Sequence, residues 1–375
     1  MKFAIITHVI HKDEENFLYA YEPYVREMNL WAKYVDEIKI VAPISNQNKS
    51  KIDAAYIHNN ISISKIPSFN LLTISNQVKA IITIPFILLK IFKVMFWADH
   101  IHLRCPGNIG LLGCFVQILF PKKSKTVKYA GNWDPNSKQP TSYNIQKWIL
   151  SNTYLTKNCK VLVYGKWKNQ SKNILPFFTA SYNKDEVELI TSKNLNKKIN
   201  FLFVGSFTKG KQPLLSVEIL KELLSKEINV HLNMYGEGLE FDLVKKYIAD
   251  NNLNENCTLH GNQPKNIIKE AYKKSHFLIF ISKSEGWPKV VAEAMFWGCL
   301  PISSNVSCIE YMLNYGKRGV VLKPNTSEKR VSIIIKNLIE NEVIYATKVV
   351  EAIKWSTNFT LDKFEAEIKK IILNE

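Results

Sequence analysis

The sequence has 375 residues, of which 46% are hydrophobic and 22% are charged, a composition typical of a globular protein that excludes a disordered chain. The length predicts two or three domains, each large enough to bury a core. Fifty Lys and Arg against 33 Asp and Glu give a formal net charge of +17. This charge favours an anionic partner, which can be nucleic acid, an anionic membrane surface or a phosphorylated substrate.

The chain has six cysteines without a paired Cys or Cys/His spacing: Cys105, Cys114, Cys159, Cys257, Cys299 and Cys308. A disulfide framework or a zinc site is therefore not expected, and a reducing compartment is the simpler interpretation. The first ten residues, MKFAIITHVI, have too short an apolar stretch for a signal peptide and lack a small-residue cleavage site. They predict a first core strand, and we expect the protein in the cytoplasm.

Strands and helices alternate along the chain, which predicts parallel sheets covered by helices. The first elements expected are a strand at Met1–His8, a helix at Tyr24–Val35 and a strand at Ile38–Pro43, which open a βαβ unit. The intervening loop contains no glycine and holds His8 and His11. A His after a first parallel strand faces the usual ligand crevice. Both are therefore candidates for ligand contact or proton transfer, with a packed or surface His as the alternative.

The segment Gln77–Trp97 is strongly apolar, but Lys79, Lys90 and Lys93 interrupt it and Pro85 is expected to break its middle. We therefore predict no transmembrane span. The three lysines share one side of a helical projection, as in a helix at a lipid interface; the alternative is a core helix with a lysine edge. A second basic cluster follows the apolar Leu111–Phe120 and comprises Lys122, Lys123, Lys125 and Lys128. Together they make docking on an anionic membrane a hypothesis, against the alternative of a solvated loop.

Two further segments complete the first half. Val127–Pro135, VKYAGNWDP, is expected to be a strand that ends in a polar turn, and Asp134 is a candidate ligand contact at its end. The alternative is an ordinary Asp before Pro in a turn. Asp185–Asn200 is polar and has no long apolar period, so a linker is expected there. The predicted domains are residues 1–190 and 191–355.

Three strand-and-turn segments open the second half. Phe201–Leu215, FLFVGSFTKGKQPLL, predicts a strand, a Gly-marked turn and a helix. Val230–Gly238, VHLNMYGEG, predicts a strand followed by two glycines, which allow a ligand to approach the backbone closely. Cys257–Gln263, CTLHGNQ, predicts a short strand and turn. Each of these signals is weak alone, and an exposed turn is the alternative.

The most informative segment runs from Phe277 to Pro301, FLIFISKSEGWPKVVAEAMFWGCLP. It predicts a buried strand, a polar turn, a helix that begins at Pro288 and ends at Gly298, and a second strand. The start of such a helix favours an anion such as a diphosphate. Glu285 lies in the turn and Glu293 on the helix, with seven residues between them. The alternative without a ligand site is that Glu285 is a solvated loop residue and Glu293 a residue on the helix surface.

At these residues the sequence resembles the retaining glycosyltransferases of family 4, whose E-x7-E motif is similar to Glu285 to Glu293. The order of the preceding motifs in the second half matches that family as well. The resemblance implies the GT-B fold: two Rossmann-like α/β domains that face a cleft, with a C-terminal helix, here residues 356–375, crossing back to the first domain.

The resemblance also implies a donor site. Lys211 falls where the family has its phosphate-binding Lys, while Ser206 stands where many members carry an Arg, and Lys209 is the candidate substitute. The expected donor contacts are Gly205, Ser206, Lys209, Lys211, Gly236, Gly261, Asn262, Glu285, Gly286, Trp287, Val290 and Glu293. The expected catalytic residues are Glu285 and Lys211 on the donor side and His8 and Asp134 on the acceptor side.

The implied activity is that of a retaining hexosyltransferase. It would move a sugar from a nucleotide diphosphate-sugar to the hydroxyl of a glycan or lipid-linked acceptor, in bacterial surface polysaccharide or lipid-linked glycan assembly. The protein would be cytoplasmic, with peripheral docking on the inner face of the membrane as a hypothesis. No cofactor is expected. The chain has no DxD sequence, so no metal is expected either.

Two other classes of protein stay open. One is a nucleotide-sugar-binding relative that has lost catalysis, which the Ser206 position and the altered first-domain loops would explain. The other is a basic nucleic-acid-binding protein, although the sequence has no zinc-finger, RRM or helix-turn-helix signature, and no nucleic-acid partner is expected. A sugar epimerase or phosphorylase on the same fold is a weaker enzymatic alternative.

Overall fold

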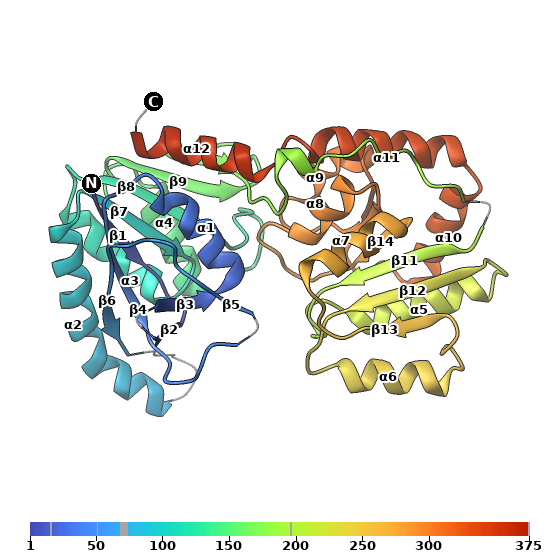
Figure 1. Ribbon diagram of the computed structural model, residues 1–375, viewed down its shortest axis with the longest axis horizontal. Helices are drawn as coiled ribbons and strands as arrows, with labels where there is room; N and C mark the ends of the chain where they lie inside the picture. Colours follow the sequence, from blue (N-terminus) through green and yellow to red (C-terminus); the bar gives the residue numbers. More distant parts are fainter. Residues whose placement is uncertain (16, 51, 68–73, 196, 374–375) are drawn as a thin grey trace. The chain divides into compact units, whose positions relative to one another are not determined.

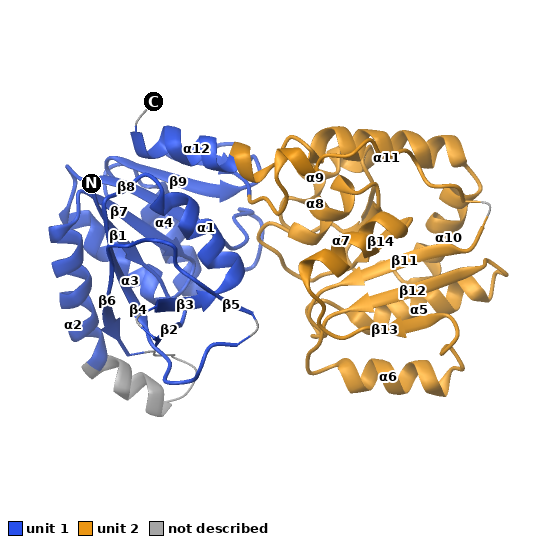
Figure 2. Cartoon of the chain, in the orientation of Figure 1, with its two compact units in different colours: residues 1–178, 364–375 blue, residues 179–363 orange. Residues whose placement is uncertain are grey.

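The computed structural model describes residues 1–15, 17–50, 52–67, 74–195 and 197–373. Two compact units form: residues 1–178 with 364–375 (unit 1), and residues 179–363 (unit 2) (Figure 2). The predicted domain boundaries, at residues 190 and 355, differ from these limits. The polar segment before residue 190 packs on unit 2. There Glu186 forms an ion pair with Lys269 at 3.0 Å. At the other end Phe364 packs on Phe178 of unit 1, with ring centroids 5.7 Å apart.

Unit 1 contains a seven-stranded parallel sheet in the order β10-β9-β8-β7-β1-β4-β6. Its strands are β1 (Lys2–Ile6), β4 (Glu37–Pro43), β6 (Ile61–Ile66), β7 (His100–Cys105), β8 (Ser124–Tyr129), β9 (Cys159–Tyr164) and β10 (Ile174–Phe177). Its helices are α1 (Glu22–Ala32), α2 (Ile74–Trp97), α3 (Asn108–Val116), α4 (Thr141–Ser151) and most of α12 (Leu361–Leu373). Short 3-10 turns lie at η1 (Gln117–Leu119) in this unit and at η2 (Lys184–Glu186) and η3 (Asn314–Gly316) in unit 2.

The strand order decides which helix covers which face. The connection from β1 to β4 through α1 runs one way along the sheet, whereas those through α2, α3 and α4 run the other way. Because such crossovers are right-handed, α1 covers one face and α2, α3 and α4 cover the opposite face (Figure 1). The C-terminal helix α12 contacts unit 1 near the end of α1, where the Glu365 carboxylate accepts from Lys33 Nζ at 2.7 Å.

A small antiparallel sheet forms where the sequence predicted a loop after the first strand. It consists of β2 (His11–Glu14), β3 (Phe17–Tyr21) and β5 (Asp53–Ala55), in the order β2-β3-β5. β3 alternates between exposed and less exposed side chains, with Leu18 and Ala20 buried, which is the pattern of a half-buried strand. The prediction was wrong at β2, which pairs with β3 in a local hairpin with His11 opposite Ala20, and β5 joins β3 from more than thirty residues further on.

The long helix α2 runs unbroken through Pro85, so the predicted break was wrong. A Pro inside a helix costs about 3 kcal/mol. The side chains of Ile87, Ile91 and Met95 are fully buried on the inner face of α2, and each contributes about 1.5–3 kcal/mol, which outweighs that cost. No helix among the described residues has the length and apolar character of a membrane span. The side chain of Lys79 lies outside the described residues.

The predicted basic cluster after residue 120 is only partly exposed. Lys125 and Lys128 lie in β8 and are buried. Lys125 Nζ donates to the Phe120 carbonyl at 2.7 Å, and Lys128 Nζ donates to the Phe178 carbonyl at 2.9 Å. Burial lowers the pKa of Lys125 to about 8. Lys123 is half-buried, and its Nζ donates to the carbonyls of Met95, Phe96 and Ala98, so Lys122 is the exposed lysine that this cluster offers to an external partner.

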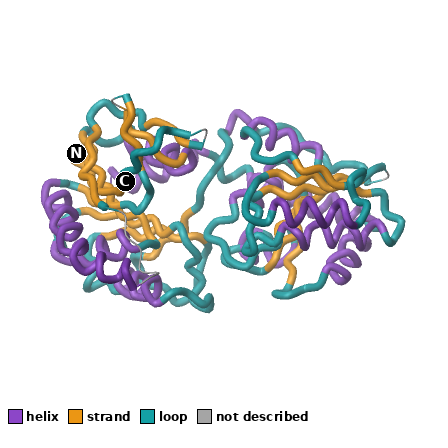
Figure 3. Tube along the Cα trace, turned by 90° about the horizontal axis from the view of Figure 1, so that it is seen from below, coloured by secondary structure: helices purple, strands orange, loops and turns teal. Residues whose placement is uncertain are grey.

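Unit 2 contains a six-stranded parallel sheet in the order β13-β12-β11-β14-β15-β16. Figure 3 shows the strands in orange and the helices in purple. Its strands are β11 (Ile199–Val204), β12 (Val230–Tyr235), β13 (Cys257–Leu259), β14 (Phe277–Phe280), β15 (Leu300–Ser304) and β16 (Val320–Leu322). Its helices are α5 (Pro213–Leu224), α6 (Phe241–Asp250), α7 (Lys265–Lys274), α8 (Lys289–Phe296), α9 (Ile309–Met312), α10 (Glu328–Ile339) and α11 (Glu342–Ser356). Phe201 and Phe277 stack at the centre, with ring centroids 5.2 Å apart.

In both sheets the order of the strands reverses beside the first strand. In unit 1 the reversal lies between β1 and β7, and in unit 2 it lies between β11 and β14. Loops that leave the carboxyl ends of strands on the two sides of such a point diverge, and ligands of open α/β sheets bind in the crevice between them. In unit 2 this crevice is formed by the loop after β11 and the loop after β14.

Unit 1 buries several histidines in neutral form. His100 and His102 both hydrogen-bond Thr126 Oγ1 at 2.9 Å and stack on Phe3. Burial lowers the pKa of His100 to about 4, and that of His11 likewise to about 4. These histidines stay neutral in the folded protein while the unfolded chain gains protons near pH 6.5. Stability is therefore complete above about pH 6.5 and is lost as the pH falls toward 4.

We expect the free energy of unfolding to fall between pH 7.5 and pH 5 by about 2 kcal/mol for each of these histidines. Urea unfolding of the wild type and of His100→Gln at both pH values tests this, because the variant should lose part of the pH dependence. His58→Gln, at a half-buried position, is the matched control and should keep it. Equal stability of the wild type at the two pH values would contradict the prediction.

Candidate active site

The two loops at the reversal point of unit 2 are tied together by their own backbone. The Lys283 amide donates to the Gly210 carbonyl at 2.9 Å, and Ser282 Oγ donates to the same carbonyl at 3.2 Å. Gln212 Nε2 donates to the Ile281 carbonyl at 3.4 Å. The turn after β11 therefore has a fixed position relative to the turn after β14.

This arrangement brings together Lys211 and Glu285, which are 74 residues apart in the sequence. Lys211 Nζ forms an ion pair with Glu285 Oε1, and the carboxylate side chain is only 11% exposed. The ammonium also lies 5.0 Å from the ring centroid of Phe280, a cation–π contact. The structure thus places a cation and an anion, both predicted as site residues, in the crevice where the topology expects a ligand.

The predicted phosphate-binding turn is otherwise open. Ser206 and Lys209 are exposed on it. A Cβ built on Gly205 would meet nothing closer than 3.8 Å, and one on Gly210 nothing closer than 3.9 Å. A ligand therefore has room beside this turn, and Lys209 is free to serve there.

The glycines after β12 have a structural reason that the sequence did not indicate. A Cβ on Gly236 would lie 1.9 Å from the Gly205 carbonyl oxygen, and one on Gly238 would lie 2.5 Å from the Phe207 carbonyl oxygen. The Gly236 amide also donates to the Gly261 carbonyl at 2.9 Å. The space beside Gly236 is thus occupied by the turn after β11. The contacts at Gly236 join the turns after β11, β12 and β13.

The predicted base-binding turn after β13 is held by polar contacts. Asn262 Nδ2 donates to Glu237 Oε2 at 3.1 Å. His260 hydrogen-bonds Asn233 Oδ1 at 2.9 Å and stacks on Tyr235 with ring centroids 4.3 Å apart. Burial lowers the pKa of His260, which keeps this ring neutral near pH 7.

Glu293 lies on α8 and is held by two hydroxyl groups. Its carboxylate accepts hydrogen bonds from Ser181 Oγ and, at 3.1 Å, from Tyr272 Oη. Burial, followed by the charge of Glu293, raises the pKa of Tyr272 well above its usual range, so this hydroxyl stays a donor. Sequence reasoning missed Ser181 and Tyr272, since neither lies in a motif.

The loop between β14 and α8 is also anchored from behind. The Gly286 carbonyl accepts from Ser307 Oγ at 2.8 Å. Trp287 is buried and packs against Trp355 and Phe359, with ring centroids 6.3 and 5.8 Å away. The helix α8 begins at Lys289, one residue later than predicted, and no side chain caps its start. Val290, in its first turn, is half-buried.

The two candidate acceptor contacts in unit 1, His8 and Asp134, lie in different local environments. His8 lies against Gly107 at the start of α3, where a Cβ would come within 2.8 Å of His8 Nδ1. Desolvation and then the charge of Arg104 lower the pKa of His8. Asp134 Oδ1 accepts from the Asn136 amide at 2.8 Å, as in an Asx turn. The carboxylate of Asp134 thus has a local role in the turn.

His11 is not available to a ligand, so this candidate was wrong. It is fully buried, and its two ring nitrogens lie 2.8 Å from the Val9 carbonyl and 2.8 Å from Tyr56 Oη. The predicted open loop is instead the strand β2, which places His11 under the small antiparallel sheet.

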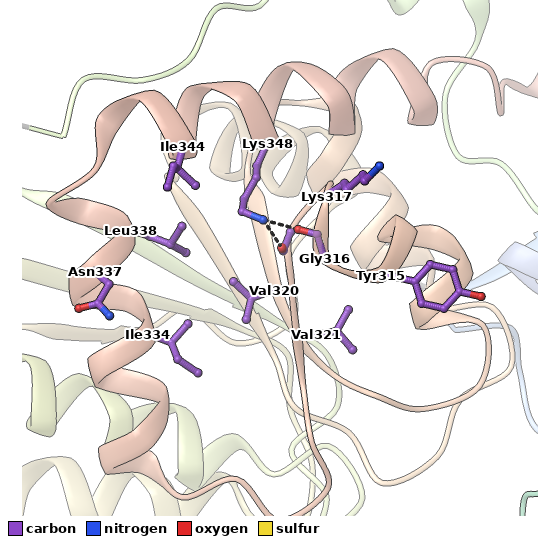
Figure 4. Close-up of a pocket in the computed structure, with 11 residues that line it drawn as sticks. Tyr315, Gly316, Lys317, Val320, Val321, Ile334, Asn337, Leu338, Ile344 and Lys348 are labelled. Atoms are coloured by element: carbon purple, nitrogen blue, oxygen red, sulfur yellow. Dashed lines mark hydrogen bonds between the residues drawn. The ribbon is translucent and has the colours of Figure 1, made fainter.

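A hollow of about 540 Å³ lies elsewhere in unit 2, where β16 meets α10 and α11 (Figure 4). Its lining includes Val320, Leu338 and Ile344. Lys348 points into it but donates to the carbonyls of Gly316 and Gly319, so its charge serves the turn before β16. None of the predicted site residues lines this hollow. In the described part of the chain, no group of three or more His, Cys, Asp or Glu side chains is placed to hold a metal ion.

Comparison with known proteins agrees with this geometry. Residues 185–355 match the family model "Glycosyl transferases group 1". The chain is 26% identical over 222 residues to an uncharacterized glycosyltransferase of Methanocaldococcus jannaschii, covering 58% of this chain and 60% of that protein. It is 33% identical over 132 residues to the capsular polysaccharide biosynthesis glycosyltransferase CapH of Staphylococcus aureus, covering 33% of this chain and 36% of CapH. The chain thus matches only part of the length of these relatives.

Among solved structures, HepE of Anabaena in complex with UDP superposes with a TM-score of 0.68 at 13% identity, covering 100% of this chain and 99% of HepE. The chain has the GT-B fold, and its similarity to the group 1 glycosyl transferase model is confined to residues 185–355. The predicted fold class is confirmed. The narrower assignment to a retaining family stays a prediction.

The glycine contacts give a prediction that separates packing from ligand binding. Gly236→Ala forces a methyl group against the Gly205 carbonyl, and we expect it to destabilise unit 2 by about 1–3 kcal/mol. Gly210→Ala is the control, because its methyl group makes only an ordinary contact, 3.9 Å from Thr208 Oγ1. Gly236 has a φ of +131°, so backbone strain adds to the loss of stability there. Urea unfolding of both variants measures the difference. If Gly236→Ala were as stable as Gly210→Ala, the loop packing described above would be incorrect.

Proposed function

We propose that the protein is a retaining glycosyltransferase of the hexosyltransferase type. It moves a sugar from a nucleotide diphosphate-sugar to an acceptor hydroxyl. The observation that carries this proposal is the Lys211–Glu285 ion pair at the strand reversal of unit 2. An ammonium can pair with a diphosphate and a carboxylate can accept hydrogen bonds from sugar hydroxyls, so this pair suits a nucleotide-sugar.

The diphosphate would lie between Lys211 and the start of α8. Its negative charge suits the ammonium of Lys211 and the uncapped amides of the first turn of α8. Both groups would stabilise the charge that develops on the departing diphosphate, which is usually the largest contribution to catalysis in such sites. Glu285 is already fixed beside Lys211 and would accept hydrogen bonds from the sugar hydroxyls.

Glu293 would accept from the ribose hydroxyls in this proposal. Its present donors, Ser181 and Tyr272, fix the carboxylate on α8, and each carboxylate oxygen has more than one lone pair for a further donor. Ser181 and Tyr272 would therefore act as positioning residues for Glu293.

Retention would require no enzymatic nucleophile. The bond from the anomeric carbon to the diphosphate oxygen breaks, the acceptor oxygen bonds to the same face of that carbon, and the acceptor proton passes to the departing diphosphate. His8 and Asp134 of unit 1 are proposed to contact the acceptor. No metal and no cofactor enters this scheme.

The names of the relatives suggest a setting. CapH is described as a capsular polysaccharide biosynthesis enzyme, and HepE was solved with UDP. We therefore propose surface polysaccharide or lipid-linked glycan assembly as the process and UDP as the first nucleotide to examine. A donor-binding relative without activity and a nucleic-acid-binding protein are the alternatives that the following experiment separates.

Thermal-shift measurements with UDP, GDP, ADP and CMP test the donor site. We expect one diphosphate to stabilise the wild type and to stabilise Lys211→Met much less, because the variant lacks the cation. Lys329→Met, at an exposed lysine of the same unit, is the control and should respond as the wild type does. Donor turnover should fall on the order of a hundredfold in Lys211→Met and in Glu285→Gln.

The outcomes separate the alternatives. Stabilisation by a diphosphate without transfer or slow hydrolysis of any donor would indicate an inactive relative. Salt-sensitive binding of DNA or RNA without stabilisation by any nucleotide would indicate a nucleic-acid-binding protein.

The stereochemistry has its own test. We expect the product to keep the anomeric configuration of the donor, since the acceptor attacks the face from which the diphosphate departs. NMR of the purified product measures it through the anomeric proton coupling of the transferred sugar, because the new glycosidic bond does not mutarotate. Inversion would overturn the retaining assignment while leaving the donor site in place.

A further inference from the structure

One face of unit 1 exposes large apolar side chains between basic ones. Helices α2, α3 and α4 lie side by side on this face of the seven-stranded sheet (Figure 1). We call the following side chains the apolar-basic face: Phe86, Leu89, Phe92 and Phe96 of α2, Phe115 of α3, Leu119 of η1, Ile145 and Trp148 of α4, and Lys90, Lys93, Lys122 and Lys123. Exposed apolar groups gathered in this way usually mark a binding surface.

The exposed stripe of α2 is separate from its core-facing side. Leu89 is 60% exposed and Phe96 is 70% exposed, and with Phe86 and Lys93 they recur at the spacing of one helix face. The buried residues of α2 lie on its other side, toward the sheet. These apolar side chains are therefore not needed for the core of unit 1.

Lysines lie directly beside the aromatic rings. Lys90 Nζ is 4.6 Å from the ring centroid of Phe86, and Lys123 Nζ is 5.7 Å from that of Phe96. Lys123 Nζ also donates to the carbonyls of Met95, Phe96 and Ala98 at the end of α2, and Lys90 Nζ donates to the Lys65 carbonyl at 2.6 Å. The exposed Lys93 and Lys122 are therefore the lysines that offer their charge to headgroups. An apolar body bordered by lysines is the arrangement of a helix that lies in a lipid interface.

The basic charge of the chain is concentrated in the segment that forms these helices, although Arg104, Lys125 and Lys128 of this segment are engaged inside unit 1. Residues 74–160 contain twelve Lys and Arg but only two Asp and Glu, which gives +10 of the total of +17. The segment 199–304, which carries the donor-site loops, contains twelve Lys and eleven Asp and Glu. The net charge therefore belongs to the part of the chain that forms α2, α3 and α4, and the donor-site segment is nearly neutral.

We propose that the apolar-basic face docks on a lipid bilayer that contains anionic lipids. The apolar side chains would enter the interface, and the lysines would meet the lipid headgroups, because an anionic bilayer offers both an apolar layer and negative charge. A nucleic acid would match the charge but leave Leu89, Phe96 and Leu119 without an apolar partner. A second copy of the chain would bring lysines against lysines. The helices lie on the surface and do not span the bilayer.

Vesicle co-sedimentation of the full chain tests this without donor or acceptor, so its result is independent of the proposed transfer reaction. The vesicles are phosphatidylcholine with and without phosphatidylglycerol, at low and at high salt. We expect binding that requires phosphatidylglycerol and weakens with salt. Lys93→Glu with Lys122→Glu should reduce the partition coefficient about tenfold or more. Leu89→Ser with Phe96→Ser should reduce binding similarly.

Two double variants in unit 2 are matched controls. Lys329→Glu with Lys354→Glu changes the same net charge at exposed positions, and Leu239→Ser with Val343→Ser removes exposed apolar groups. Both should bind as the wild type does. Circular dichroism shows whether each variant is folded. If Leu89→Ser with Phe96→Ser does not fold, the variant Lys93→Glu with Lys122→Glu still tests the proposal.

Three results would overturn the proposal. These are no binding of the wild type to anionic vesicles, equal loss of binding in the unit 2 controls, and binding that neither double variant of the apolar-basic face weakens. Sedimentation velocity examines self-association: a dimer that Leu89→Ser with Phe96→Ser dissociates would assign the face to a second copy instead. Binding of single-stranded DNA as tightly as anionic vesicles would assign it to nucleic acid.

Discussion

The right-handed crossover of parallel strands is the constraint on which the rest of the structure depends. In both sheets the strand order reverses beside the first strand, so right-handed crossovers put helices on both faces, and in unit 2 the reversal sets the turn after β11 next to the turn after β14. Lys211 and Glu285 can meet only because these two strands are paired, with Phe201 opposite Phe277 in the core. The site is thus a consequence of sheet order, and the apolar residues that fix this order also hold the two charges in place.

The Lys211–Glu285 pair has an electrostatic reason to exist in the folded chain. The Glu285 side chain is 11% exposed and that of Lys211 is 27% exposed, so each would lose hydration without gaining a partner if the other were absent. Because the pair is partly open to solvent, its charges can be shared with a third group at little extra desolvation. An arriving diphosphate would compete for the ammonium, while the carboxylate would remain beside it and turn to neutral hydroxyls.

The sequence predicts the parts of the fold and site that are encoded locally. The strand, turn and helix around Glu285 and the Gly-marked turn with Lys211 follow from periodicity and from turn residues. The partners of Glu293 could not be predicted, because Ser181 lies 112 residues away in a segment without a recognisable motif. The same limit explains β3, whose pairing with β5 is remote, and Lys128, whose carbonyl partner at Phe178 is 50 residues distant. The predicted helix break at Pro85 was wrong because the burial of Ile87 and Ile91 outweighs the low helix propensity of proline.

The net charge is a second property whose location cannot be predicted from the sequence alone. A total of +17 indicates an anionic partner but not its place, and a phosphorylated substrate alone would account for it. The fold locates the excess instead: the donor-site segment is almost balanced, and the excess lies in residues 74–160, where Lys125, Lys128 and Arg104 are turned inward to satisfy carbonyls and Glu27. Two lysines of this segment, Lys90 and Lys123, lie beside the exposed rings of Phe86 and Phe96. A partner chosen by charge alone would not require those rings, so the charge and the apolar surface are best explained by one partner that has both properties.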